Sequence, residues 1–375
     1  MGTGEASEDG GAERVVIASG WGERQVRAAG SAWPDTSSGT MEAQMVLVPL
    51  MSRAQQPPSS LQQSRSRRAL LLAGAAVALS LLAPPAPLSP SGWVRGARAQ
   101  PAGGAELRIG AIPDQKPEKL NRLYGEVARE LERQLKVPVR YVPVVDYTAA
   151  VSAFRTGSLD LVWFGGLTGV QARLQRPGAK LIAQRDIDAA FRSVFIANSK
   201  SGLKPINSVQ GLQVLRGRRF TFGSESSTSG RLMPQFFLGQ AGLKPSDFAG
   251  GAPGFSGSHD ATIALVQSGA YDAGAVNQQV WTSSLIEGKV NRAKVIAIWR
   301  TPPYPDYQWL AQPDLDQRFG KGFTNRLQGA ILSWRSSDPQ QNRILGLFGA
   351  QRFVKGDPKR YSQIEQVGRQ IGMIR

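Results

Sequence analysis

The chain has 375 residues, of which 45 are Lys or Arg, 28 are Asp or Glu and one is His, so its formal net charge is +17. It contains no cysteine, which excludes disulfides, thiolate metal sites and a lipid-modified cysteine anchor. The length is sufficient for two domains, and scattered basic residues without a nucleic-acid motif favour attraction of small anions over nucleic-acid binding. A single histidine disfavours a zinc or iron site, and only carboxylate sites for harder cations stay open. We therefore predict no metal, no cofactor and no nucleic-acid partner.

The first part of the chain has the pattern of an extension followed by an export signal. Residues 1–64 lack hydrophobic periodicity, which predicts a disordered segment or a start codon at Met51 rather than Met1. A basic segment at 65–68, an apolar run at 69–83 and an A-x-A site at 97–99 predict a secretory signal peptide over 65–99, cleaved near Ala99. The run is short for a membrane span, although an uncleaved anchor stays open. The paired arginines leave both the Sec and the Tat route open.

Strands and helices alternate in the next part of the chain. The pattern predicts strands at 107–112, 139–144 and 159–164, and helices at 118–135, 148–155 and 167–174. This alternation is typical of a parallel sheet with helices on its faces. Ligands of such sheets bind outside the carboxyl ends of the strands, so Asp114, Gln115, Tyr147 and Trp163 are candidate cleft residues. For Tyr147 and Trp163, packing in the core is an equal alternative.

The segment 221–231, T-F-G-S-E-S-S-T-S-G-R, lies between a predicted strand at 219–222 and a predicted helix at 232–238. Its hydroxyl residues, the free N–H groups of a helix start and the helix dipole together predict a site for an anion with several oxygens. An ordinary helix cap is the alternative. The segment is not a nucleotide P-loop, because six residues separate Gly223 from Gly230 and Arg231 follows. No G-x-S-x-G nucleophile motif occurs either.

Two extended apolar runs, at 193–198 and 295–300, bracket a second α/β block and predict two lobes joined by a hinge. Within this block we expect a strand near 248–249 and a helix at 259–267. After residue 310 the pattern is mainly helical and predicts a return to the first lobe. His259 opens its helix, where it is either a capping residue or the histidine of a hydrolase. Asp260 is a poor partner for it, because adjacent helical residues diverge by about 100°.

Seven motifs carry a resemblance to a known family. They are G-A-I-P-D-Q-K-P-E-K from Gly110, D-Y-T-A-A-V-S-A-F from Asp146, D-L-V-W-F-G-G from Asp160, R-D-I-D from Arg185, S-T-S-G from Ser227, G-S-H-D-A-T-I from Gly257 and Y-D-A-G-A-V-N from Tyr271. Over about 105–310 the chain resembles the phosphonate- and phosphite-type substrate-binding proteins of bacterial ABC transporters, in a subgroup labelled selenate-binding. The resemblance implies the α/β fold of the type 2 periplasmic binding proteins, with two lobes, a mostly parallel sheet in each, and two hinge crossings. We expect the lobes to span 104–198, 199–298 and, returning to the first lobe, 299–375.

The resemblance also implies roles for single residues. Tyr147 and His259 would donate to an anion oxygen, and the other oxygens would be held by the hydroxyls and N–H groups of Ser227, Thr228 and Ser229. Trp163 stands where phosphonate binders often have tyrosine. Asn277 stands near the position of an acid in binders of aminoalkyl phosphonates, which disfavours such ligands and favours phosphite, phosphate, selenate or selenite.

The expected function is that of a monomeric periplasmic receptor. It would capture a small oxyanion or phosphonate between its lobes and deliver it to the permease and ATPase of an ABC importer, without catalysis. Two alternatives stay open. One is an exported hydrolase on the same fold that uses His259, and the other is a receptor that signals to a membrane kinase.

Overall fold

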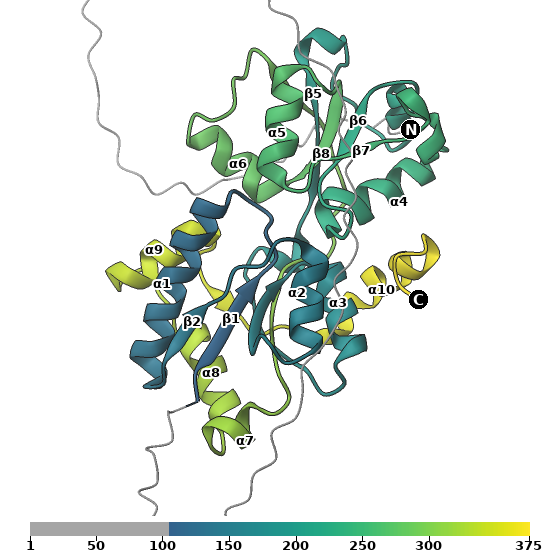
Figure 1. Ribbon diagram of the computed structural model, residues 1–375. Helices are drawn as coiled ribbons and strands as arrows, with labels where there is room; N and C mark the ends of the chain where they lie inside the picture. Colours follow the sequence, from purple (N-terminus) through teal and green to yellow (C-terminus); the bar gives the residue numbers. More distant parts are fainter. Residues whose placement is uncertain (1–104) are drawn as a thin grey trace, which may run out of the picture. The chain divides into compact units, whose positions relative to one another are not determined.

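The computed structural model describes residues 105–375, which Figure 1 shows as coloured ribbon. The predicted extension 1–64, the signal peptide 65–99 and the cleavage site near Ala99 lie outside the described residues. Within 105–375 no helix has both the length and the apolar character needed to cross a membrane.

The first sheet has six strands in the order β11-β4-β10-β3-β1-β2. They are β1 (Leu107–Ala111), β2 (Val139–Tyr141), β3 (Leu161–Phe164), β4 (Lys180–Arg185), β10 (Gln308–Ala311) and β11 (Phe353–Val354). Strand β1 is parallel to β2 and β3, whereas β10 is antiparallel to both of its neighbours and β11 is antiparallel to β4. The prediction found β1, β2 and β3. It missed β4, β10 and β11, which complete the sheet from later in the chain.

Helices cover this first sheet, and we call the sheet and its helices the first lobe. They are α1 (Pro117–Leu135), α2 (Tyr147–Arg155), α3 (Gly166–Gln175), α7 (Leu315–Phe319), α8 (Phe323–Leu332), α9 (Pro339–Phe348) and α10 (Ser362–Gln370). Helix α1 contacts α8 and α9, whereas α2 contacts α3, and α3 contacts α10 (Figure 1). The apolar spacing that predicts α1 becomes its buried face, because Leu120, Leu123, Val127 and Leu131 are all buried.

The second sheet has five strands in the order β7-β6-β8-β5-β9. They are β5 (Ser193–Asn198), β6 (Phe220–Phe222), β7 (Gly254–Phe255), β8 (Ala273–Asn277) and β9 (Val295–Arg300). Strand β6 is parallel to β7 and β8, whereas β5 is antiparallel to β8 and β9. With α4 (Met233–Gln240), α5 (His259–Ser268) and α6 (Gln278–Ile286) this sheet forms the second lobe.

The predicted two-lobed α/β fold is confirmed, with the difference that both sheets are mixed rather than mostly parallel. The runs expected to cross between lobes, 193–198 and 295–300, pair as complete strands β5 and β9 within the second sheet. The strand expected near 248–249 is instead a 3-10 turn at Ala249–Gly251, and the edge strand β7 follows it. The lobe limits at 198 and 298 therefore stay a prediction, and they would separate β5 from the sheet in which it pairs.

Candidate functional site

Three helical segments of the second lobe begin directly after strands or turns, and a polar side chain caps each of them. Ser227 accepts a hydrogen bond from the Gly230 N–H at 2.9 Å, and Ser258 accepts one from the Ala261 N–H at 3.3 Å. The Oδ1 atom of Asn277 caps α6 in the same way. Such helix starts carry unpaired N–H groups and the positive end of a helix dipole, which favours an anion nearby.

The ring of His259 joins these helix starts. It is buried, with 1% of its surface exposed, and its Nδ1 accepts a hydrogen bond from the Asn277 N–H at 3.3 Å. Burial lowers the pKa of His259 to about 3, so the ring is neutral at physiological pH. Because Nδ1 is an acceptor, the proton lies on Nε2. The Nε2 atom has no hydrogen-bond partner among residues 105–375, so it is an available donor.

The hydroxyl-rich turn before α4 packs closely around this histidine. Ser227, Thr228 and Ser229 are all buried. The Oγ1 atom of Thr228 accepts a hydrogen bond from the N–H of Leu167, in the first lobe, at 2.9 Å. A side chain at Gly230 would place its Cβ 2.9 Å from Ser227 Oγ and 3.1 Å from His259 Cε1, so this position requires glycine. The turn is therefore more than a cap, since it also forms a contact between the lobes.

A chain of hydrogen bonds crosses from the second lobe to the first. The Nδ2 atom of Asn277 donates to the Tyr307 hydroxyl at 2.8 Å, and that hydroxyl donates to Asp114 Oδ2 at 2.8 Å. Burial raises the pKa of Asp114 to about 6, although the bond from Tyr307 opposes the rise. Asn277 thus caps a helix and orients Tyr307. Tyr307 was not among the predicted site residues.

Tyr147 and Gln115 each bring a buried polar atom without a partner. Both the Tyr147 hydroxyl and Gln115 Oε1 lack a hydrogen-bond partner among the described residues. Burial raises the pKa of Tyr147 well above its ordinary value, so the hydroxyl keeps its proton; the neighbouring Ser227 side chain opposes the rise but makes no hydrogen bond to it of normal geometry. A buried hydroxyl in a plain core is normally bonded, which makes simple core packing a poor account of Tyr147.

Trp163 lies on β3 of the first sheet and contacts this group through Tyr307. Its ring stacks on Tyr307 with centroids 5.6 Å apart and also packs against Trp309, Phe348 and Phe353. Most of its surroundings are therefore aromatic core, as the alternative interpretation expected. Through the stack it also fixes the ring plane of Tyr307.

Asp306 is a second residue that the sequence reasoning missed. Its Oδ1 accepts a hydrogen bond from the Gly166 N–H, at the start of α3, at 2.8 Å. Its Oδ2 is buried without a partner within 105–375. Burial raises the pKa of Asp306 to about 7, and the Thr228 hydroxyl, which lowers it, lies beside the carboxyl. A Cβ at Gly165 would lie 3.1 Å from Thr228 Oγ1 and 3.3 Å from Asp306 Oδ1. The backbone of Gly165 therefore packs closely against Thr228 of the second lobe, and a side chain at this position would disturb the contact.

The signal for Asp306 and Tyr307 lies in strand direction. The cleft residues predicted from sequence lie at the carboxyl ends of parallel strands. Strand β10 is antiparallel to β3, with Gln308 opposite Phe164, so its amino-terminal end reaches the same edge of the sheet. In the sequence, the two polar residues stand directly before a buried strand. This pattern indicates cleft residues only when the strand is known to be antiparallel to its neighbours.

Four buried atoms without partners thus occur among these candidate residues: Gln115 Oε1, Tyr147 OH, His259 Nε2 and Asp306 Oδ2. Native proteins bond most buried polar atoms, so the group has the chemistry to hold a small polar ligand. A pocket of about 490 Å³ opens beside it and is lined from both lobes, by Gln115 and Tyr147 on one side and Ser224 and Ser226 on the other. No cluster of three or more His, Cys, Asp or Glu side chains suited to a metal occurs in 105–375.

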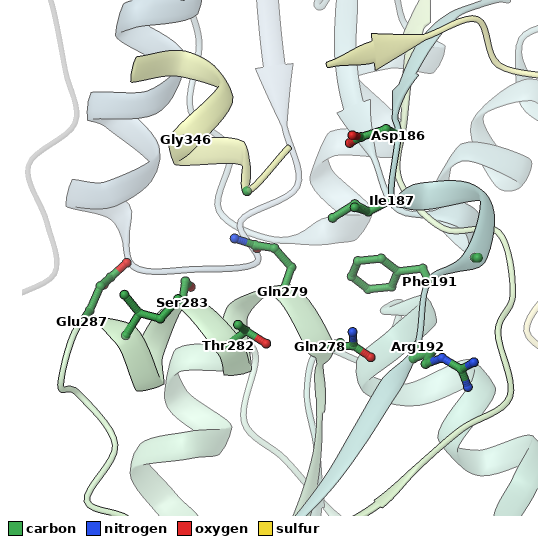
Figure 2. A pocket seen from close by; sticks show the side chains of 13 residues that line it. Asp186, Ile187, Phe191, Arg192, Gln278, Gln279, Thr282, Ser283, Glu287 and Gly346 are labelled. Atoms are coloured by element: carbon green, nitrogen blue, oxygen red, sulfur yellow. The ribbon is translucent and has the colours of Figure 1, made fainter. Parts of the chain in front are cut away.

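A larger pocket, of about 620 Å³, contains none of the predicted site residues. It lies between α6, the segment before β5 and the end of α9, and Figure 2 shows Gln279 reaching across it from α6 toward the end of α9 near Gly346. Its other labelled side chains include Phe191, Thr282 and Glu287. No unpartnered buried polar atom belongs to its lining, so its size does not make it the better candidate.

Comparisons with known proteins point to one family. Residues 109–361 match a family described as ABC transporter, phosphonate, periplasmic substrate-binding protein. The chain is 52% identical over 269 residues to the probable ABC transporter phosphite binding protein PhnD1 of Prochlorococcus marinus (strain MIT 9301), covering 72% of this chain and 91% of that protein. A structure of PhnD1 in complex with methylphosphonate aligns with a TM-score of 0.71, over 72% of this chain and 99% of the other.

More distant relatives match as well. A binding protein component of an ABC phosphonate transporter from Pseudomonas aeruginosa aligns with a TM-score of 0.60 at 19% identity, over 70% of this chain and 85% of the other. The Phosphate-import protein PhnD of Mycolicibacterium smegmatis is 25% identical over 205 residues, which are 52% of this chain and 62% of that protein. On the family match and the high identity to PhnD1, the chain belongs to the periplasmic substrate-binding proteins of phosphonate ABC transporters.

Proposed function

We propose that this protein is the periplasmic receptor of an ABC importer, that it captures phosphite or a small alkyl phosphonate between its lobes, and that it delivers this ligand to the membrane permease. The observation that carries the proposal is the neutral donor His259 Nε2, buried without a partner beside the hydroxyl-rich turn. The name of PhnD1 and its complex with methylphosphonate, at 52% identity, support this choice of ligand.

Neutral donors hold the anion in this proposal. His259 Nε2, the Tyr147 hydroxyl and the N–H groups of the turn around Thr228 would donate to its oxygens, and bonds from such donors to a charged oxygen are stronger than bonds between neutral groups. Asp306 faces the same group of atoms, and a carboxyl tolerates an anion beside it only when a proton lies between them. An anion that carries an acidic proton near neutral pH therefore suits the site better than selenate, the anion of a strong acid.

Catalysis by His259 is the weaker alternative. With its pKa lowered to about 3 the ring is a poor general base, and its Nδ1 is occupied by the Asn277 N–H. The neighbouring Asp260 accepts a hydrogen bond from the Lys116 N–H at 2.8 Å, so it has a partner other than the ring. We infer a binding protein without enzymatic activity, which acts as a monomer. A role in sensing would use the same site and differ only in the membrane partner.

Calorimetric titration of protein recovered from the periplasm tests the proposal. The panel comprises phosphite, methylphosphonate, phosphate, 2-aminoethylphosphonate, selenate, selenite and sulfate. We expect tight binding of phosphite or methylphosphonate, and weak binding of 2-aminoethylphosphonate because Asn277 offers no carboxylate to an ammonium group. Ligand at 100 times its dissociation constant should add about 2.7 kcal/mol to the free energy of unfolding. Failure of every anion to bind, or turnover that is lost in His259→Ala, would contradict it.

A further inference from the structure

Arg185, at the end of β4, is the one Lys or Arg among residues 105–375 whose side chain is buried. Its Nε donates to Asp188 Oδ2 at 2.8 Å and its Nη2 to Asp188 Oδ1 at 2.6 Å. Its Nη1 donates to the Phe348 carbonyl oxygen at 2.8 Å. Every nitrogen of the guanidinium thus makes a hydrogen bond within the first lobe, which holds the side chain in this arrangement.

The flat guanidinium also lies against the aromatic rings behind the site. Its carbon is 4.7 Å from the centre of the Tyr307 ring, 5.4 Å from that of Phe191 and 5.5 Å from that of Trp163. Stacking of this kind is favourable and holds the rings in place. Tyr307 is the middle residue of the hydrogen-bonded series Asn277–Tyr307–Asp114. By stacking on the Tyr307 ring, Arg185 helps to hold this series in place.

The charges around Arg185 are unbalanced for an anion site. Three buried carboxyls, Asp114, Asp188 and Asp306, share this one buried guanidinium, and His259 is neutral. With all three ionised, negative charges outnumber positive ones before any anion enters. The positive charge of Arg185 lowers the pKa of each of these carboxyls against the larger effect of burial.

We propose that Arg185 is a positioning residue of the anion site, which holds Tyr307 in place and supplies the positive charge that lets a cleft with three buried carboxyls accept an anion. The inference rests on the proposed function. It assigns the control of anion affinity to a residue whose guanidinium is held by Asp188 and the Phe348 carbonyl oxygen.

Besides Arg185, the groups that face these carboxyls are hydrogen-bond donors, other carboxyls and protonated phenols, and Asp188 also faces the carboxyl of Asp186. Asp306 meets the Gly166 N–H, the Thr228 hydroxyl and the carboxyl of Asp188, besides Arg185. The neighbouring phenols keep their protons because burial raises their pKa values, at Tyr147, Tyr304, Tyr307 and Tyr361. Asp114 additionally faces Asp260 and Lys119, whose charges oppose each other.

The pH dependence of anion affinity follows from the direction in which the pKa of Asp306 changes on binding. The pKa of Asp306 is raised to about 7 in the free protein, and a bound anion raises it further. The protonated carboxyl is therefore favoured in the complex, and affinity should be highest below pH 7 and decline as the pH rises above it. Loss of Arg185 adds a net negative charge, which protonation of the carboxyls offsets at low pH but not at high pH.

The test compares anion affinity at pH 6 and pH 8.5 for the wild type, Arg185→Met and Asp188→Asn, using phosphite and methylphosphonate and correcting for the ionisation of each ligand. We expect Arg185→Met to lose roughly tenfold or more in affinity at pH 8.5 and much less at pH 6. Asp188→Asn removes a negative charge, so its affinity at pH 8.5 should rise. Arg185→Lys retains the charge and should retain the wild-type pH profile.

Arg108→Met is the matched control, because Arg108 pairs with the buried Asp160 through two bonds of 3.0 and 2.9 Å in another part of the first lobe. It should lower the melting temperature without changing the affinity or its pH profile. Equal losses of affinity at both pH values in Arg185→Met, or a loss in Asp188→Asn as well, would overturn the inference. If Arg185→Met does not fold, the sign of the change in Asp188→Asn decides alone. A wild-type protein that binds no anion would overturn the proposed function, and this inference with it.

Discussion

At the scale of single residues, the protonation state of His259 has a measurable consequence. A pKa lowered to about 3 means that the ring donates as a neutral group throughout the physiological range. His259→Phe removes this donor and should weaken anion binding by about 2 kcal/mol, the usual value of a hydrogen bond to a charged partner. His259→Gln, which keeps an N–H group, should lose less.

Titration across pH separates this account from binding by a charged imidazolium. In our account the wild type and His259→Gln have parallel affinity profiles between pH 5 and pH 7, because no histidine proton is involved. An affinity that rises toward acid pH through the ordinary histidine range in the wild type alone would contradict it.

The Tyr147 hydroxyl offers a second test, because it is buried without a partner in the free protein. Tyr147→Phe should leave the stability of the free protein unchanged or slightly higher, while anion affinity falls by about 2 kcal/mol. Tyr304→Phe is the matched control, since the Tyr304 hydroxyl bonds to Ser193 Oγ at 2.6 Å. That variant should lose about 1 kcal/mol of stability. Thermal melts with and without ligand measure both effects, and equal behaviour of the two variants would refute the assignment of Tyr147.

Local sequence predicted the candidate residues that lie next to their own turns and helix starts. Ser227, Thr228 and His259 belong to this group, because the cap and the first turn of a helix are formed by residues that are adjacent in sequence. Asp306 and Tyr307 were missed because β10 comes from the far end of the chain and runs against β3. Asn277 was named from the resemblance, but its amide bonds to Tyr307, a contact that no local pattern contains.

At the scale of elements, Gly230 tests the shape of the hydroxyl-rich turn. In Gly230→Ala the new Cβ would lie 2.9 Å from Ser227 Oγ and 3.1 Å from His259 Cε1, so the turn or the ring must move. We expect a loss of about 1–3 kcal/mol in stability, as for other overpacked sites, together with weaker anion binding.

Gly239→Ala in α4 is the control, because its Cβ would meet nothing within 4 Å. A helical Ala in open space should stabilise the protein by about 0.5–1 kcal/mol and leave affinity unchanged. Wild-type affinity in Gly230→Ala would show that the turn does not hold the anion.

At the scale of the whole chain, hydrogen bonds other than the predicted ligand contacts tie the lobes together. The His259 N–H donates to the Asp114 carbonyl oxygen at 3.0 Å, and the Lys116 N–H donates to Asp260 Oδ2 at 2.8 Å. Asp260→Ala removes the second bond without touching the predicted ligand contacts. We expect it to weaken binding of every anion of the panel by the same factor, roughly two- to tenfold, because it disfavours the arrangement of the lobes in which this bond forms.

The measurement is the ratio of affinities for phosphite and methylphosphonate, which should equal that of the wild type. A changed ratio would mean that Asp260 acts on the ligand itself. Asp357→Ala, which removes a capping carboxylate that accepts from the Lys359 N–H within the first lobe, is the control and should change neither affinity.

The order of strands in the first sheet also bears on how the chain folds. Residues of the second sheet, from β5 to β9, form one continuous stretch, whereas β10 inserts between β3 and β4 from well over a hundred residues later. Contacts between segments distant in sequence form slowly, because the intervening chain must be ordered first. The second lobe should therefore acquire its structure early in refolding, and the first lobe should stay open until the end of the chain arrives. A chain of this kind cannot complete its first lobe before its synthesis is nearly finished, which leaves that lobe open for most of the time in which an export machinery can engage the chain.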